Sequence, residues 1–196
     1  MPQTFQQSLF LSAPTLPTPG LHYREAFITP EEEQDLLARI ATLPFENAKY
    51  QQYTARRRVV SFGYGYDYSR HERLPAAPLP QWLAPFVERA AGFIGVAPDE
   101  FAQALIAEYA PGTPLGWHRD VPDYEHVVGL SLLSPARLRF RRYPWRPEER
   151  DQIFALEPAP RSAYALTGEA RWRWQHSVPP VKERRISITL RTLRSR

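Results

Sequence analysis

The chain has 196 residues, a length that suits one domain, and 43% of them are hydrophobic, which excludes an intrinsically disordered protein. Its formal net charge of +4 favours anionic partners such as nucleic acid, although mild basicity is also common in proteins that bind no polymer. The absence of cysteine excludes disulfides, cysteine-based zinc sites and thiol nucleophiles.

Residues 1–20 contain four prolines followed by Gly20, a composition that disfavours both helices and central strands of a sheet. We expect an extended arm over 1–20 and a single domain over 21–196. The N-terminus lacks a basic region, and its apolar run Leu9-Phe10-Leu11 is too short for a signal core or a membrane span. A cytoplasmic monomer without membrane contact is the expectation.

Two helices are predicted in the first half of the chain, after a short strand over 21–27. Thr29-Pro30-Glu31-Glu32 has the pattern of a capping box with proline at the first helical position. Apolar residues at helical spacing then continue this helix to about Leu43. A second apolar stripe over 78–94 predicts a helix that supports the sheet.

The stretch 56–69 mixes arginines with tyrosines. One interpretation is an edge hairpin with a solvated basic face. The other is a substrate-binding segment, in which arginines meet phosphates and tyrosines stack on or bond to an everted base. Its candidate side chains are Arg58, Tyr64, Tyr66 and Tyr68.

Many short strands separated by turn signals fill the second half, which predicts a mainly β protein with two opposed sheets in a jelly roll. The expected strands are 101–109, 127–133, 136–140, 153–156, 163–166 and 171–176, the last two joined by a hairpin at Gly168. The alternating arginines at 137, 139 and 141 form either a solvated strand face or part of a phosphate track.

Trp117-His118-Arg119-Asp120 carries the first candidate metal ligands. On an extended segment His118 and Asp120 share one face, because strand side chains alternate with period two. A distant histidine, His176, would complete a facial triad of two histidines and one carboxylate, which leaves three positions of an octahedral iron(II) open. Zinc hydrolysis would use similar ligands. We expect structural roles for His22, His71 and His126.

The closing segment 185–191 predicts a strand with one apolar and one polar face. Arg185, Ser187, Thr189 and Arg191 share the polar face. The two arginines are either surface cations or bidentate donors to opposite ends of one small dianion, a pairing that zinc hydrolysis would not explain. Arg184 and Arg194 belong to the alternating set that contains the apolar residues, so they should lie at the ends of the strand and turn to solvent.

These motifs together resemble the AlkB-like iron(II) and 2-oxoglutarate dependent dioxygenases, over roughly 56–193. The resemblance rests on Tyr109-Ala-Pro-Gly112, His118-x-Asp120, His176 and the Arg-x-Ser-x-Thr-x-Arg ending. It implies a double-stranded β-helix, cupin-like, with the metal inside its open end, and a substrate lid at about 56–70.

The resemblance also implies roles for individual residues. His118, Asp120 and His176 match the iron ligands and catalytic centre. Tyr109 and Arg185 match groups that hold the distal carboxylate of 2-oxoglutarate, with Ser187 beside them, and Arg191 matches the arginine near the chelating end. Fe(II), 2-oxoglutarate and O2 are the implied cofactor and co-substrates.

Three positions depart from the family's pattern. Ala107 replaces an asparagine before the Tyr109 motif, and Ser187 replaces an asparagine in the closing strand. Nucleic-acid repair members commonly carry an acidic residue two positions after the iron aspartate, where this chain has Pro122 followed by Asp123. Trp117 and Asp123 join the candidate substrate residues.

The favoured function is oxidative demethylation of alkylated bases in DNA or RNA, with DNA repair as its expected context. The second hypothesis is the same chemistry on a protein or small molecule. The third is a non-catalytic jelly-roll module that binds a metal.

Overall fold

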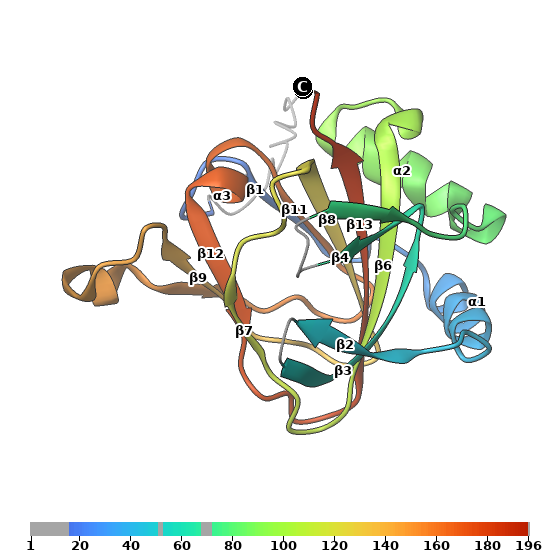
Figure 1. Ribbon diagram of the computed structural model, residues 1–196, viewed down its shortest axis with the longest axis horizontal. Helices are drawn as coiled ribbons and strands as arrows, with labels where there is room; N and C mark the ends of the chain where they lie inside the picture. Colours follow the sequence, from blue (N-terminus) through green and yellow to red (C-terminus); the bar gives the residue numbers. More distant parts are fainter. Residues whose placement is uncertain (1–15, 51–52, 68–71, 196) are drawn as a thin grey trace, which may run out of the picture.

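Two antiparallel sheets lie opposite each other in the computed structural model, which describes residues 16–50, 53–67 and 72–195 (Figure 1). The larger sheet has the order β1-β11-β8-β13-β6-β3-β2, and the smaller one has the order β10-β9-β12-β7. A third, two-stranded sheet pairs β4 with β5. The predicted jelly roll is confirmed. Most of the expected arm 1–20 lies outside the described residues.

The strands are β1 (Leu21–Arg24), β2 (Glu46–Tyr50), β3 (Tyr53–Phe62), β4 (Tyr64–Asp67), β5 (Glu72–Pro75), β6 (Phe101–Tyr109), β7 (Leu115–His118), β8 (Tyr124–Leu132), β9 (Leu138–Arg142), β10 (Phe154–Leu156), β11 (Ala163–Leu166), β12 (Trp174–Val178) and β13 (Arg185–Leu193). The helices are α1 (Pro30–Ile40), α2 (Ala84–Ile94) and α3 (Gly168–Trp172), with short 3-10 turns η1 (Gln81–Leu83), η2 (Pro98–Glu100) and η3 (Pro147–Gln152). Within the described residues, no helix is long and apolar enough to cross a membrane.

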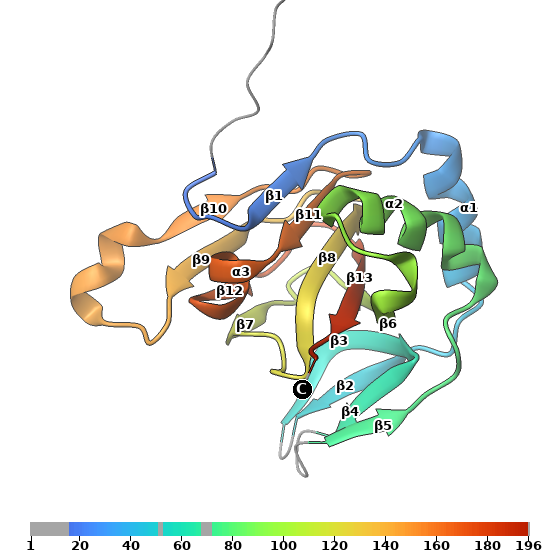
Figure 2. The ribbon, with the colours of Figure 1, turned by 90° about the horizontal axis from the view of Figure 1, so that it is seen from above.

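Helices α1 and α2 cover the outer face of the larger sheet (Figure 2). The capping box predicted for α1 is present: the Glu32 amide donates to Thr29 Oγ1 at 3.2 Å, and Glu32 Oε2 accepts from the Thr29 amide at 2.8 Å. Arg89 of α2 donates to both Glu32 carboxylate oxygens at 2.9 and 2.7 Å. One carboxylate therefore caps α1 and joins it to α2.

Strand β13 lies at the centre of the larger sheet and separates two hydrophobic cores. It pairs with β6 on one side and β8 on the other, so both edges of its backbone are hydrogen-bonded. Ile186, Ile188 and Leu190 pack into the core beneath the helices, whereas the alternate residues face the space between the sheets. The parity predicted for the closing segment is confirmed, and Arg184 and Arg194 are more than half exposed as expected.

The hairpin predicted around Gly168 is wrong. Residues 168–172 form helix α3, β11 pairs with β8 of the larger sheet, and β12 belongs to the smaller sheet. The buried side chain of Arg171 explains the helix: its Nη2 donates to the carbonyls of Val121 and Tyr124 at 2.7 and 2.8 Å. Trp172 therefore leaves the face that Trp174 and His176 share.

Candidate metal and co-substrate site

Three candidate ligands meet at the inner face of the smaller sheet. Strands β7 and β12 pair in a register that places His118 opposite His176, and their ring centroids are 4.3 Å apart. Asp120 follows two residues after the end of the His118 strand, and one ligand atom from each of the three residues lies within 4.8 Å of the others. The structure thus brings together the trio that the sequence pattern predicted.

The protonation states of the trio suit a divalent cation. Burial lowers the pKa of His118 and, with the neighbouring His118 ring, that of His176 to about 3, so both imidazoles are neutral at pH 7. Burial opposes ionisation of Asp120, but the Arg191 guanidinium and the two imidazoles hold its pKa well below the usual range. His118 Nδ1 lies 2.9 Å from the Gly116 carbonyl, which favours the tautomer with Nε2 free for a metal. Two neutral imidazoles and one carboxylate are a donor set that fits iron(II).

Two arginines hold Asp120, one at its carboxylate and one at its backbone. Arg191 donates to its Oδ1 through Nε at 2.9 Å and Nη2 at 2.5 Å, while Oδ2 lies 3.6 Å from His176 Nε2. Arg171 donates to the backbone carbonyl of Asp120 at 3.3 Å as well as to the next turn of chain. The carboxylate is therefore oriented before any metal binds.

A small cavity of about 40 Å³ lies next to the trio, between the sheets. Its walls include His118, Asp120 and His176 and the inward face of β13. Tyr109 of β6 stands directly opposite Arg185 in the strand register, and the Arg185 guanidinium lies 5.2 Å from the Tyr109 ring centroid. The predicted co-substrate residues Tyr109, Arg185, Ser187 and Arg191 all line this cavity.

Arg185 carries a buried charge that needs a counterion. Its side chain is 3% exposed, its Nε has no hydrogen-bond partner, and its Nη2 reaches only the Ser131 hydroxyl at 3.4 Å. No described carboxylate forms an ion pair with it. A buried, unpaired guanidinium is unfavourable by several kcal/mol, so an anion is the natural occupant of this cavity.

The surroundings of Tyr109 also carry an excess of positive charge. Its hydroxyl accepts a hydrogen bond from Arg57 Nη1 at 3.2 Å. Burial alone would raise the pKa of this phenol, yet the guanidinium groups of Arg57 and Arg185 outweigh burial and lower it. Two cations thus act on one hydroxyl. This hydroxyl lies at the Arg185 end of the cavity, away from Arg191, where a distal carboxylate would need positive charge.

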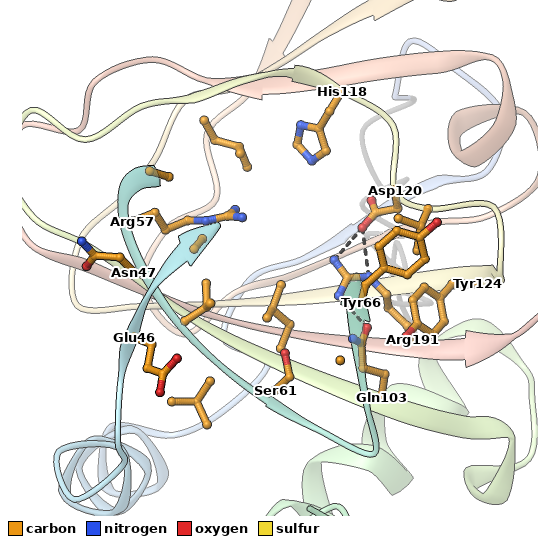
Figure 3. Close-up of a pocket in the computed structure, with 18 of the residues that line it drawn as sticks. Glu46, Asn47, Arg57, Ser61, Tyr66, Gln103, His118, Asp120, Tyr124 and Arg191 are labelled. Carbon is orange, nitrogen blue, oxygen red and sulfur yellow. Dashed lines mark hydrogen bonds and ion pairs between the residues drawn. The ribbon is translucent and has the colours of Figure 1, made fainter. Parts of the chain in front are cut away.

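A second, much larger cavity of about 1110 Å³ opens on the other side of the metal trio (Figure 3). It lies between β2, β3 and β4 on one wall and the His118–Asp120 segment on the other. Arg57 points into it across from His118, and Tyr66 lies beside Asp120 (Figure 3). His118 and Asp120 line both cavities, so the trio stands at their junction.

The candidate substrate residues are only partly gathered here. Trp117 and Tyr66 line the large cavity. Arg58 is instead ion-paired with Glu108, and Tyr64 packs under the Arg73 guanidinium, 5.1 Å from its ring centroid. Neither of these two lines the cavity. Tyr68 lies outside the described residues.

Asp123, the candidate replacement for the family's acidic residue, also does not line the large cavity. Its carboxylate is ion-paired with Arg73 of β5 at 3.3 Å. It therefore joins strand β5 to the loop after Asp120 instead of facing the large cavity.

Sequence reasoning missed three residues at the site. Arg57, rather than Arg58, faces the cavities. Adjacent residues of β3 point to opposite faces of the sheet, but which of the two faces the cavities is known only from the register of β3 with β6. Gln103 accepts from Arg191 Nη1 at 2.9 Å and donates to the Tyr64 carbonyl at 2.7 Å. Arg171 supports the Asp120 loop, and no local pattern marks it.

Comparisons with known proteins agree with this geometry. A family model described as the 2OG-Fe(II) oxygenase superfamily matches residues 20–191. The chain is 31% identical to the Arabidopsis thaliana "Alkylated DNA repair protein ALKBH8 homolog" over 90% of its length, and 30% identical to the Mus musculus "tRNA (carboxymethyluridine(34)-5-O)-methyltransferase ALKBH8" over 84%. The solved structure of OsALKBH1 aligns with a TM-score of 0.73 at 15% identity, covering 91% of this chain and 99% of that one.

The chain spans only part of these relatives. It matches 59% of the Arabidopsis protein and 25% of the mouse protein.

Proposed function

The chain belongs to the 2OG-Fe(II) oxygenase superfamily and is an AlkB-like dioxygenase that uses Fe(II), 2-oxoglutarate and O2, and from this premise we propose that it removes alkyl groups oxidatively from bases of DNA or RNA. The third hypothesis, a non-catalytic metal-binding module, is thereby set aside. Methylated nitrogen atoms are the proposed targets, and formaldehyde, succinate and CO2 are the proposed products.

One observation carries the proposal: His118 and Asp120 form a wall shared by two cavities of different size and chemistry, and His176 lines the smaller one. The small cavity, with its unpaired Arg185, suits an anion, and the large one has ample room for a base and its neighbours. The names of the two relatives refer to alkylated DNA and tRNA, which favours a nucleic acid among possible substrates.

Iron(II), 2-oxoglutarate and O2, when bound, supply the oxidation of a substrate C–H bond. His118, Asp120 and His176 would hold the metal, with the imidazoles neutral and the carboxylate fixed by Arg191. On an N-methyl group, the hydroxylated carbon leaves as formaldehyde and the nitrogen recovers its proton.

The remaining inward residues of β13 and β6 would hold the co-substrate. Arg185 and the Tyr109 hydroxyl would bind its distal carboxylate, Arg57 would support that hydroxyl, and Ser187 would contribute a further hydroxyl. We propose that Ser187 and Ala107 tune the affinity for 2-oxoglutarate without abolishing it, because the two arginines and the tyrosine keep their inward positions.

The large cavity offers polar groups for a base. Arg57 and Tyr66 face it, together with Asn47 and Ser61 (Figure 3). Since Asp123 is ion-paired outside the cavity, we propose that the base edge is read by these side chains rather than by an acidic residue. A single domain over 21–196, a monomeric state and a cytoplasmic location stay predictions.

The decisive experiment measures formaldehyde and succinate from a panel of methylated oligonucleotides and methylated peptides, with iron(II), ascorbate and 2-oxoglutarate. Formaldehyde from oligonucleotides supports the proposal, whereas product from peptides or small molecules alone replaces it with the second hypothesis. His118→Ala and His176→Ala should abolish succinate formation. Retained iron-dependent turnover in both variants would contradict the assignment of the metal site.

A further inference from the structure

The outer face of the smaller sheet carries a row of arginines and tryptophans on the side opposite the metal. Trp117 and the ligand His118 are neighbours on β7 and lie on opposite faces of the strand, and the Trp117 ring contacts the Arg139 guanidinium. Arg139 and Arg141 of β9 lie on the same outer face. We call Trp117, Arg139, Arg141 and Trp145 the arginine–tryptophan surface.

Cations and rings alternate along this surface. The Trp117 ring centroid lies 5.0 Å from the Arg139 guanidinium and 4.5 Å from that of Arg141. Arg141 in turn lies 5.0 Å from the ring of Trp145, which is 37% exposed. These distances are within cation–π range, so the order of the row is guanidinium, indole, guanidinium, indole.

The two arginines are held in place by neutral groups. Arg139 Nε donates to the Ser177 hydroxyl at 3.2 Å, and Arg141 Nε donates to Gln175 Oε1 at 2.8 Å, both on β12. Among the described residues, neither forms an ion pair. The terminal nitrogens of each guanidinium thus remain donors for a further acceptor.

Their charges also act on each other. Burial and the adjacent Arg139 lower the pKa of Arg141, which reflects two cations side by side without a neutralising carboxylate. The other arginines of this strand region differ: Arg137 lies 4.0 Å from Glu157, and Arg142 lies 3.3 Å from Glu169. Of the four arginines between 137 and 142, therefore, only the two on the arginine–tryptophan surface have no carboxylate partner among the described residues.

This surface is continuous with the catalytic cavity. Trp117 lines the large cavity and precedes the ligand His118 on β7, the edge strand of the smaller sheet. The segment after β9 projects from the body of the protein (Figures 1 and 2). The Arg119 guanidinium stacks 3.6 Å from the ring centroid of Tyr143 on that segment, which joins it to the metal loop.

We propose that the arginine–tryptophan surface binds single-stranded nucleic acid next to the base in the cavity, its arginines contacting phosphates and its indoles stacking on bases. This proposal rests on the proposed function, because the strand bound on this surface is the one whose alkylated base enters the large cavity. Alternating flat rings and cations match alternating bases and phosphates, whereas an acidic peptide would need the cations alone.

The test measures binding of an unmodified labelled oligodeoxythymidylate of about 15 nucleotides as a function of salt concentration. The Arg139→Gln/Arg141→Gln variant is compared with Arg137→Gln/Arg142→Gln, which loses the same charge from the same strand region. Each phosphate contact contributes roughly 0.7 to the log–log salt slope of single strands, so the first variant should reduce the slope by about 1.4 and the second should not. Trp145→Ala should weaken binding about tenfold through lost stacking.

A second measurement is independent of any substitution. Ultraviolet crosslinking of the wild-type complex should attach the oligonucleotide to peptides that contain Trp117 or Trp145. Equal salt slopes for the two double variants, crosslinks confined to other peptides, or polyglutamate that competes as well as the oligonucleotide would each overturn the proposal.

The two proposals fail in different ways. If no methylated oligonucleotide yields formaldehyde but the slope still falls in Arg139→Gln/Arg141→Gln alone, the surface stands and the demethylase proposal fails. If formaldehyde forms while both double variants bind and turn over alike, the demethylase proposal stands and the surface fails.

Discussion

Arg191 grips a single oxygen of Asp120, with two hydrogen bonds of 2.9 and 2.5 Å to Oδ1, and leaves Oδ2 facing His176 Nε2 at 3.6 Å. From the resemblance, Arg191 was expected near the chelating end of 2-oxoglutarate. It lines that cavity, and its hydrogen bonds include those to Asp120 and Gln103. We therefore propose that Arg191 influences metal binding by orienting the Asp120 carboxylate.

The first prediction concerns this pair. Arg191→Gln should weaken iron binding by about 10- to 100-fold, since groups that orient a metal ligand typically have effects of this size. Titration with Fe(II) under anaerobic conditions, or with Mn(II) as a probe, measures the affinity. Arg194→Gln is the matched control, because Arg194 lies three residues later on the exposed end of the chain and pairs with Glu125. Equal metal affinities for both variants would argue against the orienting role.

The second prediction concerns the buried charge of Arg185. Arg185→Gln should raise the KM for 2-oxoglutarate by at least about 30-fold, because removing one partner of a buried charge pair is unfavourable by 2–5 kcal/mol. It should also abolish the rise in melting temperature that 2-oxoglutarate gives to the Mn(II)-loaded protein. Arg184→Gln, on the neighbouring exposed position, should change neither quantity. An unchanged KM in Arg185→Gln would place the distal carboxylate elsewhere.

The third prediction concerns a close contact beneath the co-substrate cavity. Gly129 of β8 lies directly under the Tyr164 ring, and a Cβ at this position would overlap ring atoms of that buried side chain. Gly129→Ala should therefore destabilise the fold by about 1–3 kcal/mol and raise the KM for 2-oxoglutarate, since Tyr164 lines the small cavity.

The control for this substitution is Gly92→Ala. Gly92 is in helix α2 with open space around its Cβ position, so alanine should stabilise the protein by about 0.5–1 kcal/mol. Urea unfolding and succinate assays measure both effects. A Gly129→Ala protein as stable as wild type would show that the Tyr164 ring has room to move.

The fourth prediction concerns stability in acid. Hydrogen bonds from Arg89 lower the pKa of Glu32 from 4.5 to about 2. A carboxylate with a depressed pKa stabilises the fold above its unfolded pKa, and this contribution is lost as the pH falls from about 4.5 to about 2. Glu32→Gln, which keeps the capping pattern, should be less stable than wild type by about 1–2 kcal/mol at pH 7, because the pair is partly exposed.

Denaturant unfolding at pH 7 and near pH 2 tests this. The difference between Glu32→Gln and wild type should shrink towards the lower pH. Glu88→Gln on the exposed side of α2 serves as the control. A difference that stays constant with pH would mean that the charge of Glu32 contributes nothing.

Sequence alone could identify the residues whose orientation follows from the alternation of side chains along a strand. The inward face of β13 follows from parity, because an apolar and a polar set alternate over seven residues, and the structure puts Arg185 and Arg191 on the polar side. The His118-x-Asp120 pair follows from the same rule. His176 could be named from the resemblance, but its contact with His118 depends on the register of β7 and β12, which no local pattern encodes.

Other assignments failed because distant contacts decided them. Trp172, Trp174 and His176 alternate as if in one strand, yet Arg171 binds three carbonyls of the Asp120 loop and holds residues 168–172 as a helix. Arg57 and Arg58 are adjacent and identical in type, so only the pairing of β3 with β6 shows which one faces the cavity.

We propose that strand β13 sets the length of the diacid that the site accepts. Its two edges are bonded to β6 and β8, so Arg185 cannot shift along the sheet without breaking both ladders. A dicarboxylate one methylene shorter or longer would meet Arg185 and the metal at the wrong separation. Discrimination against oxaloacetate and 2-oxoadipate would then come from backbone spacing. Changes in the residues around the large cavity would alter the choice of substrate without altering this selection of the co-substrate.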